Sequence, residues 1–361
     1  MAKEKKTSLV KQFFVNLLLG ANLFTLVLLW VCCATTWIDP SLHPSVSMVG
    51  LGFPVFIILN LIFIPLWLLF QARMVIVPVV GMALCGSYIL DYCPLHFDSS
   101  DESDITVMTW NCHEMQLYQP DSIEYATGYI AESGADIICL QEYNFNNGKY
   151  KALHETMLEK GYHLEHKTGG LAIMSRFPIL SCEVIDMESV TTNGAFLADV
   201  QLPDGDTLSV FCVHLECTRL SLDDKNEYGA SLRSGESERM KDEAHYLQGK
   251  LSDAAKLRAL QVNELVERLD SLPQLRSVLI CGDFNDTPIS YAYQHVARRL
   301  QNAYRQGGQG IGLSFRERLF PVRIDHIFHT KDYTCTSARV DNSISASDHY
   351  PVIATLQKCE K

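Results

Sequence analysis

The sequence has little charge, and the charge that it has is unevenly spread. Only 20% of its 361 residues are charged and 47% are hydrophobic, which excludes an intrinsically disordered chain. Residues 1–95 hold five basic and three acidic side chains, so the totals of 30 and 42 leave 25 basic and 39 acidic in 96–361, a net charge of −14. A broadly basic surface that binds nucleic acid is therefore not expected, which leaves room only for a local basic groove.

Three runs near the N-terminus lack charged residues altogether. They cover residues 12–33, 48–70 and 74–90. Crossing a bilayer takes about 20 helical residues, and these runs lack the polar alternation of barrel strands. We expect three transmembrane helices, with residues 1–95 as a membrane anchor that contacts the lipid bilayer through residues 12–90. A cleaved signal peptide is the rival interpretation of the first run, but that run is long and two more follow it.

Basic residues are missing from two of the segments that flank these runs. Residues 34–47 and 91–104 contain no Lys or Arg, whereas four lysines precede the first run and Arg73 lies between the second and third. Because basic residues collect on the cytoplasmic side, we expect an integral protein of the cytoplasmic (inner) membrane with its C-terminal domain outside the cytoplasm. The alternative is a re-entrant third segment, which would place that domain in the cytoplasm.

The twelve cysteines include no Cys-x-x-Cys pair with metal-site spacing. Cys139, Cys212 and Cys281 each lie in an apolar, strand-like run, where a cysteine is usually a small buried side chain. We expect no disulfide framework. One bridge stays open among Cys93, Cys112, Cys182, Cys217, Cys335 and Cys359.

Residues 96–104 are an acidic linker, and 105–361 have the pattern of one alternating α/β domain. Short apolar runs predict strands at 105–110, 136–140, 171–174, 195–200, 208–215, 278–281, 323–328 and 350–356. Helical spacing predicts helices at 123–133, 254–269 and 290–300. Many strands and few long helices favour two packed β-sheets flanked by helices.

Polar side chains of a particular kind end these strands. They are Asn111, Glu142, His214, Asp283 with Asn285, Asp325, and Asp348 with His349. Each one alone is weak evidence, because a glutamate after a strand is usually a solvated loop residue and Asp and Asn suit turns. Their joint occurrence at strand ends is much harder to attribute to turns.

The chemistry of this set points to phosphate-ester hydrolysis. The carboxylates and amides supply the oxygen ligands that Mg²⁺ prefers. His214 and His349 supply donors or a proton shuttle near neutral pH, and Asp325 could orient a histidine. The sequence lacks a serine nucleophile elbow, a P-loop and a dinucleotide-binding glycine pattern, so no competing chemistry is indicated.

At these positions the sequence resembles the endonuclease/exonuclease/phosphatase superfamily, which includes DNase-like nucleases, neutral sphingomyelinases and inositol-phosphate phosphatases. The matching pieces are Thr109-Trp110-Asn111, Leu140-Gln141-Glu142, Gly170 to Pro178, Val213-His214-Leu215, Gly282-Asp283-Phe284-Asn285, Ile324-Asp325-His326 and Ser347-Asp348-His349. They extend over about 104–357 and identify the superfamily far better than the substrate.

The resemblance implies a four-layer α/β sandwich and a divalent-metal hydrolase using Mg²⁺, with Mn²⁺ as a substitute. It implies that Glu142 binds the metal, with Asn111 nearby and Asp348 as an additional ligand. It further implies that Asp283, helped by Asn285, activates the attacking water. His214 and His349 would contact the scissile phosphate, with Asp325 paired to His349.

Departures from specialised members narrow the choice of substrate. Members that act on abasic DNA resemble Gln-Glu-x-Lys, where this chain has Gln141-Glu142-Tyr143-Asn144. Inositol 5-phosphatases carry Gly-Asp-x-Asn-Tyr-Arg, where Asp286-Thr287-Pro288 follows Asn285 here. The form with Asp-Thr-Pro resembles many bacterial members of undefined substrate.

The function expected is thus a membrane-anchored phosphoesterase whose substrate is a lipid head group, a nucleotide or a nucleic acid. The close alternative is an endo- or exonuclease, and a less favoured one is a catalytically inactive membrane scaffold on the same fold. A transporter is disfavoured because the three runs hold no charged residue. The charge-dense segment 218–252 is either a solvated surface excursion or a lid beside the site.

Overall fold

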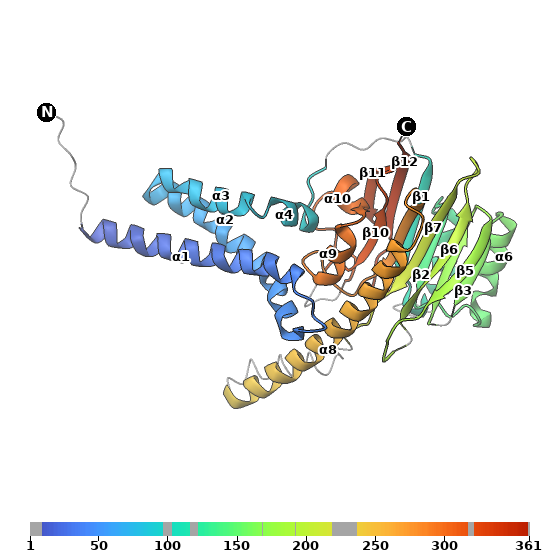
Figure 1. The fold of residues 1–361 in the computed structure, drawn as a ribbon, viewed down its shortest axis with the longest axis horizontal. Coiled ribbons are helices and arrows are strands. Elements are labelled where there is room, and N and C mark those ends of the chain that lie inside the picture. The colour runs from blue at the N-terminus through green and yellow to red at the C-terminus, as the bar shows by residue number, and fades with distance from the viewer. Residues whose placement is uncertain are drawn as a thin grey trace.

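The computed structural model describes residues 9–96, 103–115, 122–167, 169–191, 193–218, 237–316 and 321–359. Most of the expected linker and the first part of the charge-dense segment, residues 97–102 and 219–236, lie outside the described residues. The rest forms an elongated bundle of apolar helices that leads into a β-sandwich (Figure 1).

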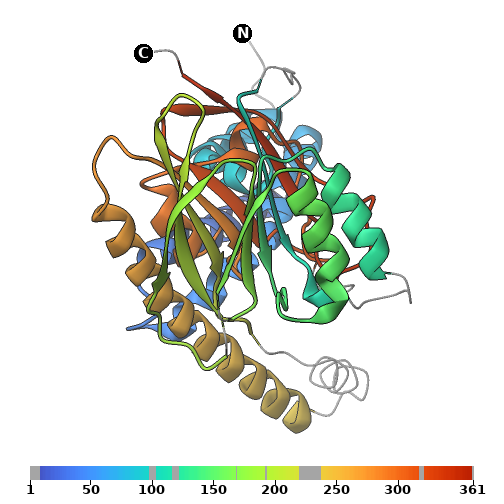
Figure 2. The ribbon, with the colours of Figure 1, turned by 90° about the vertical axis from the view of Figure 1, so that its right-hand side faces the viewer.

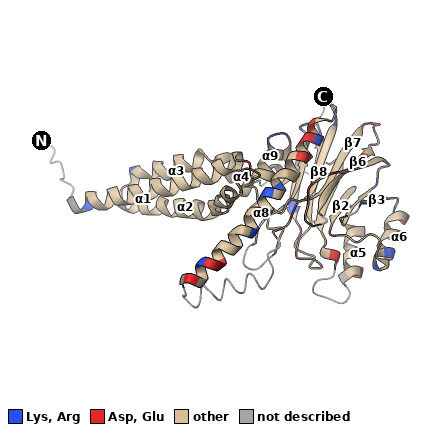
Figure 3. Ribbon diagram, turned by 60° about the horizontal axis from the view of Figure 1, so that its bottom comes forward, with Lys and Arg blue, Asp and Glu red and all other residues tan. Residues whose placement is uncertain are grey.

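The first two helices of the bundle match the first two charge-free runs. Helix α1 (Leu9–Ala34) continues into the short 3-10 helix η1 (Thr35–Trp37), and η2 (Pro44–Gly52) leads into α2 (Phe53–Phe70). The stretches Lys11–Trp37 and Pro44–Phe70 are long and apolar enough to cross a membrane. Charged residues are nearly absent from them, in contrast to α8 and the sandwich (Figure 3).

The third run forms a broken helix and not one straight helix. After η3 (Ala72–Val75), helix α3 (Ile76–Ala83) breaks at Leu84 and Cys85, and α4 (Gly86–Tyr92) continues at a bend of 68° across the Ala72–Ala83 and Gly86–Tyr92 segments. Each half is too short to cross a bilayer alone. The pair is therefore a broken span or a re-entrant segment, so the structure has two candidate membrane helices, or three if the pair counts as one.

Polar side chains join the first two helices. Asn22 Nδ2 donates to Asn60 Oδ1 at 2.9 Å, and Trp67 Nε1 donates to Asn22 Oδ1 at 2.9 Å. All three side chains are buried. In lipid the hydrophobic effect cannot drive helices together, so hydrogen bonds and close packing hold them instead.

Two six-stranded mixed sheets form the sandwich. The first has the order β11-β12-β1-β2-β4-β3 and the second β5-β6-β7-β8-β10-β9. The strands of the first are β1 (Ile105–Asn111), β2 (Ile137–Gln141), β3 (His163–Lys167), β4 (Leu171–Ser175), β11 (Tyr333–Val340) and β12 (Val352–Lys358). The strands of the second are β5 (Ile179–Ile185), β6 (Gly194–Gln201), β7 (Thr207–His214), β8 (Ser277–Asp283), β9 (Gln301–Asn302) and β10 (Asp325–His329).

Helices cover the outer face of each sheet (Figure 2). One side has α5 (Ser122–Glu132) and α6 (Lys151–Glu159), with the short η4 (His113–Met115) and η5 (Gly148–Tyr150). The other has α8 (Ser237–Asp270) and α9 (Tyr291–Ala297), and α10 (Ala303–Gly307) lies near α4. The expected architecture of two packed sheets flanked by helices is confirmed.

Three apolar layers hold these elements together. Alternate residues of the strands, such as Val107, Val210 and Leu279, face each other between the sheets, while their neighbours face the helices. Each fully buried aliphatic side chain contributes about 1.5–3 kcal/mol. Cys139, Cys212 and Cys281 are buried in this core as expected, and all twelve cysteines are free thiols.

Helix α8 is longer than its sequence pattern predicts. The expected helix at 254–269 begins instead at Ser237, so the second half of the charge-dense segment 218–252 is helical. Ser252 contacts Met48 of η2 at 3.8 Å, which brings this helix against the segment that leads into the candidate membrane helix α2.

Candidate active site

Strand register brings the predicted residues together at one end of the sandwich. In the first sheet, β1 and β2 run parallel with Asn111 opposite Gln141, so Asn111 and Glu142 end neighbouring strands. In the second sheet, β7 and β8 run parallel with His214 opposite Asp283, and β10 pairs antiparallel with Asp325 opposite the same Asp283. The carboxyl ends of the parallel pairs from both sheets therefore meet at one edge.

Gly282 permits the close approach of β7 and β8. Its φ is 156°, and a Cβ there would lie 1.8 Å from the carbonyl oxygen of Val213. Any other residue would force the two strands apart. The glycine is thus required for His214 and Asp283 to lie side by side.

Two of the predicted residues adopt left-handed backbone conformations. Glu142 has φ 51° and Asn285 has φ 50°. Such conformations cost on the order of 1–3 kcal/mol in a non-glycine residue and cluster at functional sites. Gly170, whose Cβ would lie 3.2 Å from Glu142 Cα, leaves room for the first of these turns.

Asn111 connects the carboxylates of the two sheets. Its Nδ2 donates to Glu142 Oε1 and to Asp283 Oδ2, at 3.0 Å each. Burial alone would raise the pKa of Glu142, but the hydrogen bond from His113, the charge of His214 and the Asn111 amide together lower it to about 2. Glu142 is therefore ionised, and its side chain stays 37% exposed.

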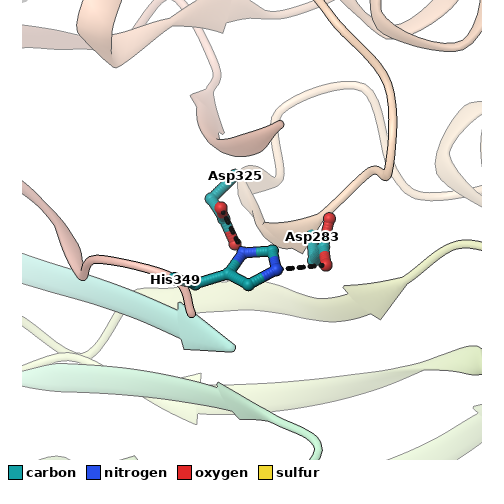
Figure 4. Close-up of side chains that lie close together, drawn as sticks. All are labelled: Asp283, Asp325 and His349. Carbon is teal, nitrogen blue, oxygen red and sulfur yellow. Dashed lines mark hydrogen bonds and ion pairs between the residues drawn. The ribbon is translucent and has the colours of Figure 1, made fainter. Parts of the chain in front are cut away.

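Asp283, Asp325 and His349 form a buried triad (Figure 4). His349 Nδ1 lies 2.8 Å from Asp325 Oδ2 and His349 Nε2 lies 3.7 Å from Asp283 Oδ2. Burial would lower the pKa of His349, but the charges of Asp325 and Asp283 raise it to about 10. Burial and the charge of Asp325 raise the pKa of Asp283 to about 6, against the lowering effect of the histidines.

The remaining predicted residues surround this triad. His214 Nε2 lies 3.6 Å from Asp283 Oδ2, and among the described residues neither nitrogen of its buried ring has a hydrogen-bond partner. Asn285 donates from its backbone N–H to Asp283 Oδ1 at 2.7 Å. Asp348 lies at the rim with its side chain 31% exposed. The structure thus brings all eight predicted residues into one site.

Two residues that the sequence did not single out also belong to the site. His113 Nδ1 lies 3.1 Å from Glu142 Oε2 and 3.8 Å from Asp348 Oδ1, and the contact with Glu142 raises the pKa of His113. Ser347 Oγ donates to the backbone oxygen of Asn111 at 2.7 Å. The sequence could have identified them only by their position near predicted residues, because His113 follows Asn111 by two residues and Ser347 precedes Asp348.

Two sets of side chains could hold a divalent cation. The ligand atoms of Asp283, Asp325 and His349 lie within 4.8 Å of one another. A protonated histidine has no free lone pair, however, and the raised pKa of His349 makes it protonated at neutral pH. Glu142 and Asp348 offer only oxygens, are partly exposed and lie on either side of the His113 ring, so they fit a hard cation better.

A polar cleft of about 440 Å³ opens beside Glu142 and His214. Its wall continues over Asn144, Phe145, His166, Lys167 and Asn193, among others. The His166 and Phe145 rings stack with their centroids 3.9 Å apart. The cleft provides room for a polar group bonded to a phosphate held at the site.

Comparison with protein-family models gives two matches. Residues 108–349 match the model described as the endonuclease/exonuclease/phosphatase family. Residues 15–92, which include the candidate membrane helices, match a domain of unknown function. No curated protein matches the chain.

Solved structures share the fold. The human Nocturnin catalytic domain with bound sulfate anion is 19% identical with a TM-score of 0.52, over 73% of this chain and 97% of that one. An endonuclease/exonuclease/phosphatase from Beutenbergia cavernae is 19% identical with a TM-score of 0.51, over 71% and 72%. TDP2 from D. rerio, complexed with a single-strand DNA product, is 16% identical with a TM-score of 0.50, over 70% and 99%.

Proposed function

The chain belongs to the endonuclease/exonuclease/phosphatase family, and from that premise we propose that it is a membrane-anchored, Mg²⁺-dependent phosphoesterase. Residues 1–95 are the membrane anchor in this proposal, and 105–361 are the catalytic domain. Members of the family hydrolyse phosphate esters, so hydrolysis is the activity to expect. One observation carries the proposal: a single amide, Asn111, joins an ionised, partly exposed Glu142 to a buried Asp283 between two histidines.

The metal is assigned to the oxygen-rich rim. Glu142 would hold Mg²⁺, with Asp348 as a further ligand and Asn111 beside it, and Mn²⁺ could substitute. When bound there, the cation supplies polarisation of the phosphate and neutralises charge that builds on its oxygens.

The chain's own residues supply the remaining chemistry. Asp283, oriented by the Asn285 backbone N–H and the Asn111 amide, is placed to take the proton from an attacking water. His349 carries a positive charge that Asp325 holds in place, and His214 has two uncommitted nitrogens among the described residues. Both histidines can donate hydrogen bonds to the phosphate as its negative charge grows.

A test follows from assays of the full chain in detergent, with bis(p-nitrophenyl) phosphate and p-nitrophenyl phosphate as the probes. Hydrolysis is expected with Mg²⁺ and should be lost with EDTA. Glu142→Gln and Asp283→Asn should each lower kcat by a factor of about 10³ or more while the protein elutes unchanged in size-exclusion chromatography. Near-normal rates in either variant would refute the proposed metal and base.

A nuclease is the second candidate, because TDP2 from D. rerio was solved with a DNA product. The net charge of −14 in 96–361, from 25 basic and 39 acidic residues, disfavours long polyanions. A panel of phospholipid vesicles, nucleotides, and single- and double-stranded DNA separates lipid head group, nucleotide and nucleic acid as substrates. An inactive scaffold would turn over none of them.

A further inference from the structure

The loop that carries the catalytic motif ends among the membrane helices. Ile289 follows Asp283 by six positions and is only 2% exposed. Its neighbours in one buried cluster come from α1, from α2 and from the break between α3 and α4; they are Leu26, Leu29, Cys32, Cys33, Phe53 and Cys85. A residue of the sandwich therefore completes the core of the membrane bundle.

Gly50 fixes the backbone of the same loop from the membrane side. A Cβ on Gly50, which is in η2, would lie 2.6 Å from the carbonyl oxygen of Ile289 and 3.2 Å from Thr35 Oγ1. Real Cβ atoms do not approach a backbone oxygen that closely. The loop and η2 are thus in direct backbone contact.

Asp91, the next-to-last residue of α4, ties down the same end of the loop through Gln294. Its side chain is buried and accepts hydrogen bonds from Arg305 Nη1 at 2.6 Å and Gln294 Nε2 at 2.9 Å. The same Gln294 Nε2 donates to the carbonyl oxygen of Pro288 at 3.0 Å. Asp91 therefore fixes the position of Gln294, which in turn hydrogen-bonds to the loop at Pro288.

The strand bearing the second aspartate of the triad is attached in the same way. Arg323 lies two positions before Asp325, is 2% exposed, and donates to the backbone oxygen of Asp91. Its guanidinium also lies over the Tyr304 ring, 4.2 Å from the centroid. Both aspartates thus stand within six residues of a contact with the membrane segment.

A passive tether needs none of these contacts. Burying a carboxylate is costly unless it is paired and hydrogen-bonded, and such pairs specify one geometry. The hydrogen bonds and ion pair of Asp91 therefore fix how the bundle packs against the sandwich. The catalytic loop lies at this contact.

We propose that the membrane segment positions the catalytic loop, with Gly50 and Asp91 as positioning residues that act on Asp283 and Asn285 through residues 286–294. The kinetic consequence rests on the proposed phosphoesterase function, whereas the ordering of the loop does not. Displacing a catalytic group by a fraction of an ångström lowers the rate of the chemical step more than it changes substrate binding.

The experiment compares Gly50→Ala with Gly20→Ala in the full chain in lipid nanodiscs. Gly20 is also in the membrane segment, but a Cβ there meets nothing within 4 Å. Gly50→Ala should lower kcat on bis(p-nitrophenyl) phosphate by about 10- to 100-fold with KM within about twofold, and Gly20→Ala should match wild type. In hydrogen-exchange mass spectrometry, peptides from 284–296 should exchange faster in Gly50→Ala only.

Asp91→Asn gives a second test, should Gly50→Ala fail to fold. Its control, Asp270→Asn, removes an exposed pair with Arg299 at 2.8 Å and touches no part of the loop. Faster exchange in 284–296 for Asp91→Asn but not for Asp270→Asn supports the inference, even if no probe is hydrolysed and the proposed function fails. Wild-type exchange in these peptides, or wild-type kcat in folded Gly50→Ala, would overturn it.

Discussion

The Asn111 side chain links the two sheets at the candidate active site. Its amide nitrogen donates to a carboxylate from each sheet, so the distance between Glu142 and Asp283 depends on it. The family resemblance implied that Asn111 would lie near a metal. Its connecting role needs both sheets in place, and no sequence pattern states which two carboxylates it joins.

At the same scale, Asp325→Asn should lower kcat by about 10²–10⁴ while changing KM little. The substitution removes the negative charge that helps to keep His349 positive, and an acidic partner of a catalytic histidine typically contributes this much. Steady-state kinetics with Mg²⁺ on bis(p-nitrophenyl) phosphate measure the effect. Asp204→Asn, which removes an exposed pair with Lys358, is the control and should keep wild-type rates; equal rates in both variants would contradict the expectation.

The buried side chain of His326 should make the stability of the folded chain depend on pH. Burial and the nearby charge of Arg323 lower its pKa to about 3, so it stays neutral in the folded chain. In the unfolded chain the His326 side chain binds a proton below about pH 6.5, whereas in the folded chain it does not. The contribution of His326 to the free energy of unfolding is therefore complete above pH 6.5, and it falls by about 1.4 kcal/mol per pH unit from there towards pH 3.

The test measures apparent Tm against pH from 7.5 to 5 in detergent. His326→Gln keeps a donor for the carbonyl of Asp286, which His326 Nε2 contacts at 3.2 Å. The fall in Tm with decreasing pH should be less steep in this variant, because unfolding then takes up about one proton fewer. The exposed His163→Gln should leave the slope unchanged. An unaltered slope in His326→Gln would show that another group dominates.

At the scale of elements, α1 and α2 depend on the Asn22–Asn60–Trp67 hydrogen bonds. Asn22→Ala should lower the stability of the bundle by about 1–2 kcal/mol, because it leaves the buried Trp67 N–H without its acceptor. The midpoint temperature of the monodisperse peak in detergent reports the loss. Asn16→Ala, at an exposed position of α1, should behave as wild type; an equal loss there would point to helix propensity instead.

The bend between α3 and α4 also matters at this scale. A straight helix over 74–90 would carry Asp91 along the axis of α3, whereas the 68° bend turns α4 so that Asp91 meets Arg305 and Gln294. The charge-free run predicted an apolar helix but not the position of its break at Leu84 and Cys85.

At the scale of the whole molecule, the loops predict a catalytic domain outside the cytoplasm. A phosphatase reporter fused after Lys361 should therefore be active outside the cytoplasm, because residues 34–47 and 91–104 contain no Lys or Arg. A fusion after Arg73, on the expected inner side, should be inactive in the same assay. Inactivity of both fusions would mean that the third segment is re-entrant, and the opposite pattern would mean that the whole topology is inverted.

The sequence by itself determined the fold class and eight members of the candidate site. Alternating apolar residues specify strands in any surroundings. Asn111, Glu142 and Asp283 stand at or directly after strand ends because strand length is a local property. The local pattern also located the first two candidate membrane helices, since a long charge-free run has few alternatives in water or in lipid.

Only the tertiary structure decided how these pieces act on one another. His113 and Ser347 entered the site through contacts between segments far apart in the chain, and α8 extended to Ser237, beyond its predicted start. The contacts of Ile289 and Asp91 between the apolar helices and the sandwich have the same origin. Contacts between distant segments depend on how buried surfaces fit together, which local periodicity does not encode.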